Sequence, residues 1–352
     1  MENINKIISA PIFFKKNRVG RVYTGGALFA SFFGDDSTDG YEPEEWVVSS
    51  VKAINKDSKG EKEGVSKILG TELYFDTLLN DYKSRMLGDR EEFGVLTKVL
   101  DSAIRLPVQA HPDKAFSKEY FGSNYGKAES WIILATRPDA CIYFGFKDEI
   151  TEEEFETAIE QSLTDNTAME KLLNRVPVSV GDVYFVPAKM VHAIGKGCLI
   201  LEIQEPTDFT IQPEYFCGEY RLNDQEMYLG LDKKTALKVF DFSLYGKKAI
   251  EMGKKIPVKV FDNNGAVIED LITYEDTTCF AVKRYSIENS QITLTEKPAV
   301  YIVTDGNGTV ICNNQEKKIK KGDYFFLPYS ASETVIKSQN NITFVACLPP
   351  QK

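Results

Sequence analysis

Histidine is scarce in this sequence: only His111 and His192 occur among 352 residues. Neutral imidazole is a common ligand of catalytic divalent metals, because it offers a lone pair at neutral pH. A chain with so little histidine therefore concentrates any imidazole chemistry at two places. Taken alone, each histidine would be an ordinary structural or surface residue, so its meaning depends on the residues around it.

Disulfide motifs, long apolar runs and a signal peptide are also missing. The six cysteines are scattered and none forms a CxxC pair, so we expect reduced thiols. No apolar run approaches the roughly 20 residues that span a bilayer. The N-terminus lacks the charged start and apolar core of a signal peptide. These absences predict a cytoplasmic chain without a membrane partner.

Basic charge is in short supply. The chain has 42 Lys and Arg against 52 Asp and Glu, a net charge of −10, and no basic stripe with interleaved aromatic residues. Contacts to the phosphate backbone dominate nucleic-acid affinity, so this charge balance argues against a nucleic-acid partner. A few local lysines suffice for one phosphate group, so a small phosphorylated substrate stays open. The oligomeric state is also left open.

Short strand-like segments make up most of the sequence. Runs rich in Val, Ile, Tyr and Phe between turn residues are typical of strands, and they occur at 45–51, 130–135, 182–186 and 198–203. Helical spacing appears at 72–86, more briefly at 93–100, and most clearly at 151–173. In the last segment Thr151 and Glu154 predict a capping box, with acidic residues in the first turn.

An internal repeat divides the chain. The segment VGDVYFVP at 180–187 is matched by KGDYFFLP at 321–328. A Gly-Asp turn that leads into an apolar strand ending in proline resembles a sequence box of cupin barrels. Five residues beyond the proline lies His192 in the first copy and Glu333 in the second. Only the first copy therefore has a histidine at this position.

The repeat predicts a mainly β fold with some helix (α+β). We expect two cupin-like antiparallel β-barrel or jelly-roll units plus helical segments. Residues 1–245 would form a catalytic, metal-binding domain with helical insertions. Residues 246–352 would form a degenerate second cupin domain without metal.

Four side chains form a candidate metal site. Gln109 and His111 are two residues apart, so on a strand they face the same side. Glu129 opens the next apolar run, His192 follows a strand end, and small barrels let such inward side chains converge. Two imidazoles, one carboxylate and one amide oxygen leave room for water or substrate, as catalytic metals require. Such mixed ligation suits Zn, and also Fe, Mn, Co or Ni.

The surrounding motifs carry a family resemblance. In order, LPVQAHPD, GKAESW, VPAKMVHAIG and LEIQ resemble type I mannose-6-phosphate isomerases, at 106–113, 126–131, 186–195 and 201–204. The resemblance covers roughly residues 10–230, and the C-terminal part matches as a degenerate second cupin unit. It implies one Zn²⁺ per chain, held by Gln109, His111, Glu129 and His192. It also implies an isomerase that interconverts mannose 6-phosphate and fructose 6-phosphate.

This reaction moves a proton between C2 and C1 through an enediol, so it needs a base and a stabilised oxyanion. The resemblance implies that Lys127 and Glu202 are nearest to that role, and that Lys98 adds positive charge. From the residues alone, Lys127 could also be a solvated lysine at a strand edge. Lys98 could be a structural lysine whose side chain reaches the surface. Glu202 ends an apolar strand, where an unpaired carboxylate would cost several kcal/mol, so it needs a partner or a catalytic role.

Two residues depart from the family pattern. Pro107 stands where the family commonly has a phosphate-binding serine, and Gln212 stands where it has an arginine. Glutamine supplies neither permanent charge nor forked donors, and Arg105 or Arg221 could replace the missing charge.

These departures favour an alternative function, a sugar-binding or regulatory cupin that keeps its metal, or an isomerase of a different sugar. An iron-dependent cupin oxygenase is a further alternative. Gln109 argues against it, because the facial triad of two histidines and one carboxylate contains no glutamine.

Overall fold

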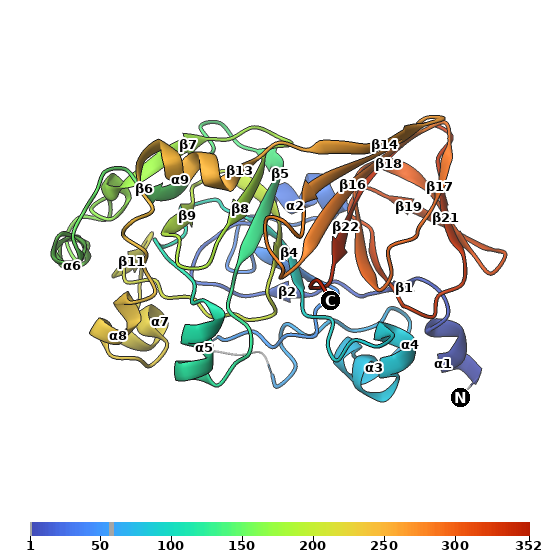
Figure 1. Ribbon diagram of the computed structural model, residues 1–352, viewed down its shortest axis with the longest axis horizontal. Helices are drawn as coiled ribbons and strands as arrows, with labels where there is room; N and C mark the ends of the chain where they lie inside the picture. Colours follow the sequence, from blue (N-terminus) through green and yellow to red (C-terminus); the bar gives the residue numbers. More distant parts are fainter. Residues whose placement is uncertain (1, 56–59) are drawn as a thin grey trace.

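The computed structural model describes residues 2–55 and 60–352. Strands in antiparallel sheets dominate the described chain, and short helices lie around them (Figure 1). The predicted fold class, mainly β with some helix, is therefore confirmed. None of the described helices has the length and apolar character needed to cross a bilayer.

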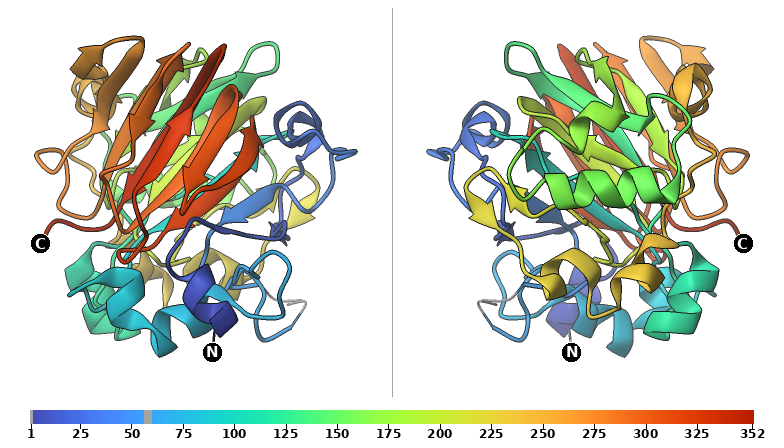
Figure 2. Two further views of the ribbon diagram at one scale, coloured as in Figure 1. Left: turned by 90° about the vertical axis from the view of Figure 1, so that its right-hand side faces the viewer. Right: turned by 90° about the vertical axis from the view of Figure 1, so that its left-hand side faces the viewer.

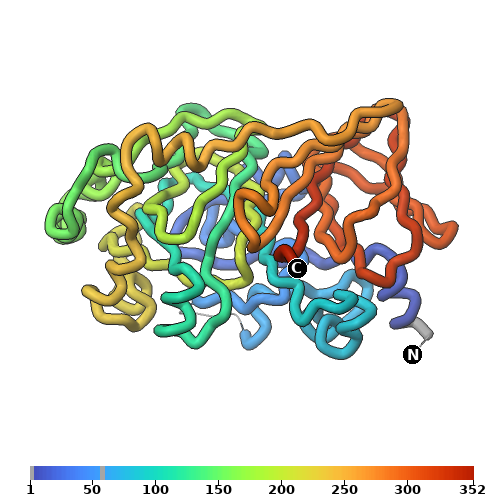
Figure 3. The backbone as a smooth tube through the Cα atoms, in the orientation of Figure 1, coloured from blue at the N-terminus to red at the C-terminus, as the bar shows by residue number. Residues whose placement is uncertain are grey.

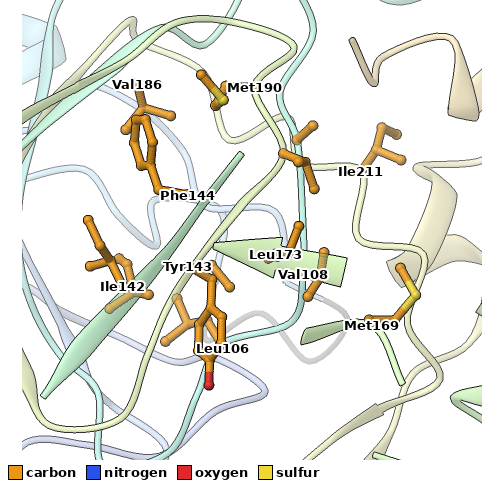
Figure 4. Packing of buried hydrophobic residues seen from close by; sticks show 14 of the residues in the cluster. Leu106, Val108, Ile142, Tyr143, Phe144, Met169, Leu173, Val186, Met190 and Ile211 are labelled. Carbon is orange, nitrogen blue, oxygen red and sulfur yellow. The ribbon is translucent and has the colours of Figure 1, made fainter. Parts of the chain in front are cut away.

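The first large sheet has seven strands in the order β13-β8-β5-β10-β4-β3-β2. A smaller sheet, β7-β6-β9, lies opposite it, and one hydrophobic cluster fills the space between them. Figure 4 shows side chains of this cluster from β6, β8 and the segment before His111. The strands are β2 (Arg18–Val19), β3 (Glu44–Val47), β4 (Leu96–Asp101), β5 (Glu129–Thr136), β6 (Cys141–Phe146), β7 (Leu173–Pro177), β8 (Val183–Val186), β9 (His192–Ile194), β10 (Cys198–Gln204) and β13 (Lys254–Lys255).

The second large sheet has ten strands, and its main path runs β1-β20-β18-β22-β16-β15-β14. A two-stranded sheet, β11 (Phe216–Cys217) and β12 (Tyr220–Arg221), lies apart from it. The strands of the second large sheet are β1 (Ile12–Phe13), β14 (Val258–Asn263), β15 (Ala266–Ile272), β16 (Ala281–Glu288), β17 (Gln291–Thr293), β18 (Ala299–Cys312), β19 (Gln315–Lys320), β20 (Tyr324–Leu327), β21 (Thr334–Lys337) and β22 (Asn341–Leu348).

Central strands of the first sheet are buried on both faces. In β10, Leu199 and Leu201 belong to a cluster shared with the second large sheet, whereas Ile200 belongs to the cluster inside the first barrel. Successive side chains of a strand point to opposite faces, so Glu202 points into the first barrel with Ile200. Lys98 of β4 is its partner in register. Strand geometry thus directs two charged side chains into the barrel.

The repeat predicted from the Gly-Asp boxes appears in the strand pairing. β8 pairs with β5 in the first barrel, and β20 pairs with β18 in the second. Glu129 lies opposite Val186, one residue before the first proline. Ala299 lies opposite Leu327, one residue before the second. Ala299 therefore occupies the position that corresponds to Glu129, and Glu333 is exposed just before β21.

Aromatic rings fill the interior of the second barrel. Tyr301 stacks on Phe325 with ring centroids 5.3 Å apart, and Tyr285 stacks on Phe344 at 4.9 Å. All four side chains are buried in one cluster of that barrel. These close-packed rings make the interior of the second barrel a hydrophobic core.

On each side of residue 245, one strand joins the large sheet formed mainly by the other part of the chain. β1 joins the second large sheet beside β20, and β13 joins the first beside β8. The tube in Figure 3 shows the segment around β13 and β14 running from one barrel to the other. Because pairings cross residue 245 in both directions, the division into 1–245 and 246–352 stays a prediction.

The helices are short, and three sequence expectations need correction. The segment 72–86 forms α3 and α4, which meet at Tyr82. The segment 93–100 is not helical, because residues from Leu96 onward form β4, which pairs on both sides and is buried throughout. The helices are α1 (Glu2–Ile7), α2 (Ala27–Phe33), α3 (Phe75–Asp81), α4 (Lys83–Leu87), α5 (Lys114–Phe121), α6 (Glu152–Gln161), α7 (Asp224–Tyr228), α8 (Lys233–Leu237) and α9 (Gly246–Gly253).

The segment 151–173 is helical only in its first half. The Thr151 and Glu154 capping box is present at the start of α6, as predicted. After α6, the side chain of Asp165 accepts hydrogen bonds from the backbone N–H and hydroxyl of Thr167. Such local bonds compete with the helix, and only a short 3₁₀ turn follows at Glu170–Leu172.

Candidate active site

Three predicted metal ligands converge in the first barrel. Their donor atoms, from His111, Glu129 and His192, all lie within 4.8 Å of one another. Two backbone hydrogen bonds of 2.9 Å link Gln109 and His192 reciprocally, which fixes the segment before His111 against β9. Glu129 is the first residue of β5. Residues far apart in sequence thus meet because three segments adjoin inside one barrel.

Both imidazole rings present the same nitrogen to the cluster. His111 Nδ1 lies 2.9 Å from the carbonyl of Phe209, and His192 Nδ1 lies 2.8 Å from the carbonyl of Met190. A carbonyl oxygen can only accept, so each Nδ1 carries the hydrogen and each Nε2 keeps its lone pair. The two Nε2 atoms lie 3.2 and 3.4 Å from oxygens of Glu129.

The donor set fits a metal ion. Glu129 Oε1 is buried and has no hydrogen-bond partner among residues 2–55 and 60–352. The amide of Gln109 also reaches the cluster, with Nε2 3.3 Å from His192 Nε2. Buried polar atoms normally have partners, so a carboxylate oxygen that is free of hydrogen bonds fits a site for a cation. Imidazole, carboxylate and amide groups suit zinc and several other divalent ions.

The protonation states of these groups also suit a metal. Burial lowers the pKa of His111 to about 3 and lowers the pKa of His192 as well, so both rings are neutral at pH 7. Burial alone would raise the pKa of Glu129, but Lys127 and the two histidines hold it well below its ordinary value. Neutral imidazole and ionised carboxylate are the forms that bind metal.

Lys127 is buried beside the ligands and is not a solvated strand-edge lysine. Its side chain is 4% exposed. Its Nζ lies 2.7 Å from His111 Nε2 and 2.5 Å from Glu129 Oε2. The ammonium group therefore lies against two ligand atoms and next to any substrate bound there.

A cavity of about 1030 Å³ opens beside the cluster. Gln109 and Lys127 contact the metal-ligand cluster and also line the cavity, so they connect the two. All three predicted catalytic residues, Lys98, Lys127 and Glu202, line this cavity. The sequence-predicted residues that line it are Lys98, Gln109, Lys127 and Glu202, together with Pro107 and Gln212.

Lys98 and Glu202 form a buried pair on the cavity wall. Lys98 Nζ lies 3.6 Å from Glu202 Oε1, and each side chain is 5% exposed, so Lys98 does not snorkel to the surface. Burial, together with the charge of Glu129, raises the pKa of Glu202 to about 7. Burial opposes the charge of Lys98, but Glu44, Glu202 and Asp208 raise its pKa.

Five further charged residues of the cavity were missed from the sequence, and three of them, Arg21, Glu44 and Asp208, form ion pairs around Lys98. Arg21 Nε lies 3.0 Å from a carboxylate oxygen of Glu44, and Arg21 Nη2 lies 3.1 Å from one of Asp208. Lys98 Nζ lies 3.8 and 3.9 Å from the same two carboxylates. Strand alternation could have identified Glu44, because it lies opposite Leu100, whose side chain faces the first barrel. Arg21 and Asp208 lie outside strands, where no periodic pattern indicates direction.

Arg105 and Arg221, the two residues considered as replacements for the missing arginine, do not line the cavity. Arg105 is held by Glu214 at 2.6 Å and Glu170 at 2.8 Å, and Arg221 is exposed in β12. Neither lines the cavity, whereas Arg21 does. Gln212 also lines it, but its amide donates a hydrogen bond to the backbone carbonyl of Glu226.

This chain is similar in sequence to several known proteins. Residues 270–347 match the family model described as mannose-6-phosphate isomerase, cupin domain. Mannose-6-phosphate isomerase ManA of Bacillus subtilis (strain 168) is 36% identical over 253 residues, which are 70% of this chain and 72% of that protein. The mannose-6-phosphate isomerase of Streptococcus mutans is 27% identical over 91% of this chain and 93% of the relative.

Solved structures share the fold over nearly the whole chain. The mannose 6-phosphate isomerase of Bacillus subtilis superposes with a TM-score of 0.73 at 24% identity, over 96% of this chain and 99% of that one. A mannose 6-phosphate isomerase described as zinc bound gives 0.71 at 15% identity, over 97% and 100%. The fold is thus that of the cupin-type isomerases. The resemblance found in the motifs is confirmed, and the chain belongs to the mannose-6-phosphate isomerase family.

Proposed function

We propose that this chain is a metal-dependent isomerase that interconverts mannose 6-phosphate and fructose 6-phosphate through an enediol. The observation that carries the proposal is the meeting of His111, Glu129 and His192 beside a cavity that contains Lys127 and Glu202. Membership in the family supports the reaction, and this geometry supplies the groups that such a reaction needs.

Gln109, His111, Glu129 and His192 would hold one Zn²⁺ ion per chain. Other divalent ions fit the same nitrogen and oxygen donors. When bound, the ion supplies positive charge that stabilises negative oxygen on the substrate. The zinc-bound relative supports this choice of metal.

Glu202 is the candidate proton carrier. Its carboxyl group lines the cavity, and its pKa of about 7 means that both protonation states are populated near neutral pH. Such a group can take a proton from C2 of the aldose and return it to C1 of the ketose. Lys98, at 3.6 Å, holds the carboxylate in place and stabilises its charged form.

Lys127 is the candidate donor to substrate oxygen. Its Nζ lies 2.5 Å from Glu129 Oε2, so the carboxylate can hold the ammonium group in place before the sugar binds, while the lone pair of His111 Nε2 would go to the metal. A hydrogen bond from a fixed ammonium group is strongest when negative charge develops on the oxygen. Lys127 would therefore stabilise the enediolate more than the sugar.

The substrate class is a sugar phosphate. A cavity of about 1030 Å³ accommodates a hexose phosphate, and three described cations, Arg21, Lys98 and Lys127, line it. Pro107 and Gln212 also line it, so the departures from the family pattern lie at the site itself. They are the observation that favours the second candidate, a metal-binding cupin that binds a sugar without turning it over.

A coupled assay for fructose 6-phosphate separates the two candidates. Purified protein is given mannose 6-phosphate before and after chelator treatment, and metal content is measured in parallel. Turnover that chelator abolishes and added Zn²⁺ restores supports the isomerase. One bound metal per chain without turnover contradicts it and supports the binding protein.

A further inference from the structure

Lys127 lies in a segment that is neither helix nor strand. The segment runs from the end of α5, at Phe121, to the start of β5, at Glu129. Figure 2 shows α5, in teal, at the lower end of the molecule in both views, and the segment leads from there into the first barrel. A lysine side chain is a long and flexible stem. The position of the Lys127 ammonium group therefore depends on the contacts that hold this irregular backbone.

The regular pairing of β5 with β10 ends at the start of β5. The last pair in register joins Glu129 of β5 to Gln204 of β10. One backbone hydrogen bond of 3.0 Å continues beyond this pair, from the N–H of Glu205 to the carbonyl of Ala128. The carbonyl of Glu205 accepts instead from the side-chain amide of Gln204 and from the backbone N–H of Thr207. The backbone N–H of Ala128 therefore needs a different acceptor.

The side chain of Glu205 supplies that acceptor. Its Oε2 accepts from the backbone N–H of Ala128 at 3.1 Å, and its Oε1 accepts from the backbone N–H of Gly126 at 3.3 Å. These two donors flank Lys127 in the chain. An ionised carboxylate only accepts, so both oxygens suit N–H donors, and a charged acceptor forms the stronger bonds. Glu205 is 2% exposed, and Lys114 Nζ lies 3.6 Å from its Oε1, so the buried charge is paired.

Two more hydrogen bonds hold the same segment. The Thr207 hydroxyl donates to the carbonyl of Gly126 at 2.7 Å, and the backbone N–H of Lys127 donates to the carbonyl of Pro112 at 3.0 Å. A Cβ atom at position 126 would lie 2.6 Å from that carbonyl of Pro112, so the close approach needs glycine. Every backbone N–H from 126 to 128 thus has a partner. We call the side chains of Glu205 and Thr207 the 205/207 clamp.

The metal ligands are held by other contacts. Glu129 is paired in register with residues of both β8 and β10. Gln109 and His192 are joined by two reciprocal backbone hydrogen bonds. Loss of the 205/207 clamp would therefore displace Lys127 first, while the ligand atoms keep their own anchors.

We propose that Glu205, together with Thr207, is a positioning residue for Lys127. Glu205 does not line the cavity, and it acts by holding the backbone from which the ammonium group reaches the substrate. This inference rests on the proposed isomerase function, in which Lys127 stabilises the enediolate more than the sugar. Loss of the clamp should lower kcat more than it changes KM, because the lost interaction is made mainly in the transition state.

Glu205→Gln is the first test. Glutamine has nearly the same shape, but one of its two terminal atoms is a donor, so one backbone N–H beside Lys127 loses its acceptor. We expect kcat to fall about tenfold, because a small displacement of a group at the reacting centre has a large effect on the rate. KM and metal content should stay close to the wild-type values. Glu154→Gln changes a carboxylate that accepts a backbone N–H outside the site, so it is the matched control and should keep the wild-type kcat.

The Thr207 hydroxyl gives an independent test. Thr207→Val keeps the volume of the side chain and removes its bond to Gly126, whereas Thr207→Ser keeps the hydroxyl. We expect kcat to fall severalfold in the valine variant and to stay near the wild-type value in the serine variant. Equal rates of the two variants would contradict a role for this hydrogen bond.

A double-mutant cycle separates positioning from general support of the fold. In a Lys127→Met background the clamp has no ammonium group to position, so adding Glu205→Gln should not lower kcat further. A further loss of about tenfold in that background would overturn the proposal, because Glu205 would then act by another route.

Amide hydrogen exchange tests the clamp without substrate. Residues 126–128 should exchange faster in Glu205→Gln than in the wild-type protein, while β8 should exchange at the same rate in both. A wild-type protein without turnover contradicts the proposed isomerase function alone. Unchanged exchange at 126–128, or an unchanged kcat of Glu205→Gln in an active protein, contradicts the positioning role.

Discussion

At the scale of single residues, hydrogen-bond partners outside the ligand set decide how the site can bind a metal. The carbonyls of Met190 and Phe209 keep the Nδ1 hydrogen in place on each histidine. Both Nε2 lone pairs therefore point toward Glu129, whose Oε1 has no hydrogen-bond partner in the described chain. Metal affinity should follow from these orientations as much as from the ligands themselves.

Removing either histidine should remove the metal. We expect the metal content of the His111→Ala and His192→Ala variants to fall from one ion per chain to almost none. Their circular dichroism spectra should change little. Elemental analysis after dialysis measures this. Glu333→Ala, at the corresponding position of the second repeat, is the control and should keep its metal. Full metal content in either histidine variant would contradict the ligand assignment.

Lys127→Met should separate catalysis from metal binding. Methionine keeps most of the side-chain volume but removes the ammonium group, so kcat should fall by about 10²-fold or more. The four ligands stay in place, so the metal should remain. Initial rates and metal content of the same sample check both statements, and an unchanged rate would exclude Lys127 from the reaction.

Glu202 should affect stability in a pH-dependent way. Its pKa in the folded chain is about 7, above the ordinary value of 4.5, so the folded state holds the proton more tightly. The contribution of Glu202 is therefore fully present below pH 4.5 and is lost as pH rises through 7.

Glu202→Gln removes this titration. From pH 5 to pH 8 in chelator, the variant should gain on the order of 3 kcal/mol relative to wild type. Urea unfolding of both proteins across this range measures the difference. A difference that does not change with pH would show that the pKa of Glu202 is not raised in the metal-free protein.

The motifs predicted which residues meet at the site, but not all of their surroundings. His111 and His192 are recognisable because histidine is rare in this chain, and Gln109 is recognisable because it lies in the same motif as His111. Arg21 and Asp208 had no such pattern, since loop residues are directed by tertiary contacts alone. Their ion pairs could therefore be found only from the structure.

At the scale of elements, strand pairing and burial determine the secondary structure wherever the local sequence pattern fits both a helix and a strand. The strands around Trp131 and Leu201 were predicted closely, because β-branched and aromatic runs between turn residues have few alternatives. The segment 93–100 was misread as helical, since helical spacing and a strand buried on both faces look alike over eight residues. Sheet partners on both sides of β4 settle the choice.

The capping box of α6 gives a test at this scale. Thr151 accepts a hydrogen bond from the backbone N–H of Glu154, whose carboxylate accepts one from the backbone N–H of Thr151. We expect Thr151→Ala to lower the free energy of unfolding by about 1 kcal/mol. Thr157→Ala, in the same exposed helix, is the control and should not destabilise. Equal effects of the two substitutions would mean that the cap contributes nothing.

At the scale of the whole molecule, the two barrels share a strand pairing but differ in their interiors. Both keep the Gly-Asp strand and its pairing, but the second has Ala299 where the first has Glu129. Stacked rings such as Tyr301 and Phe325 fill the second interior, while the first retains a cavity. The second barrel therefore contributes a rigid hydrophobic support against the back of the catalytic sheet.

A buried hydrogen bond joins the two barrels. The Tyr324 hydroxyl of β20 donates to Glu45 of β3 at 2.5 Å, and Glu45 also accepts from the backbone N–H of Asn17. Tyr324→Phe should lower the free energy of unfolding by about 2 kcal/mol, because it leaves a buried carboxylate short of one donor. Urea unfolding measures this, with exposed Tyr329→Phe as the control. Equal stabilities of the Tyr324 variant and wild type would contradict it.

The pairing of β1 with β20 bears on how the chain is made. Residues 12 and 13 are synthesised long before their partners at 325 and 326. During translation, the strand at 12–13 therefore has no β20 to pair with until those residues have been made. Its pairing with the second large sheet cannot be an early step of folding on the ribosome.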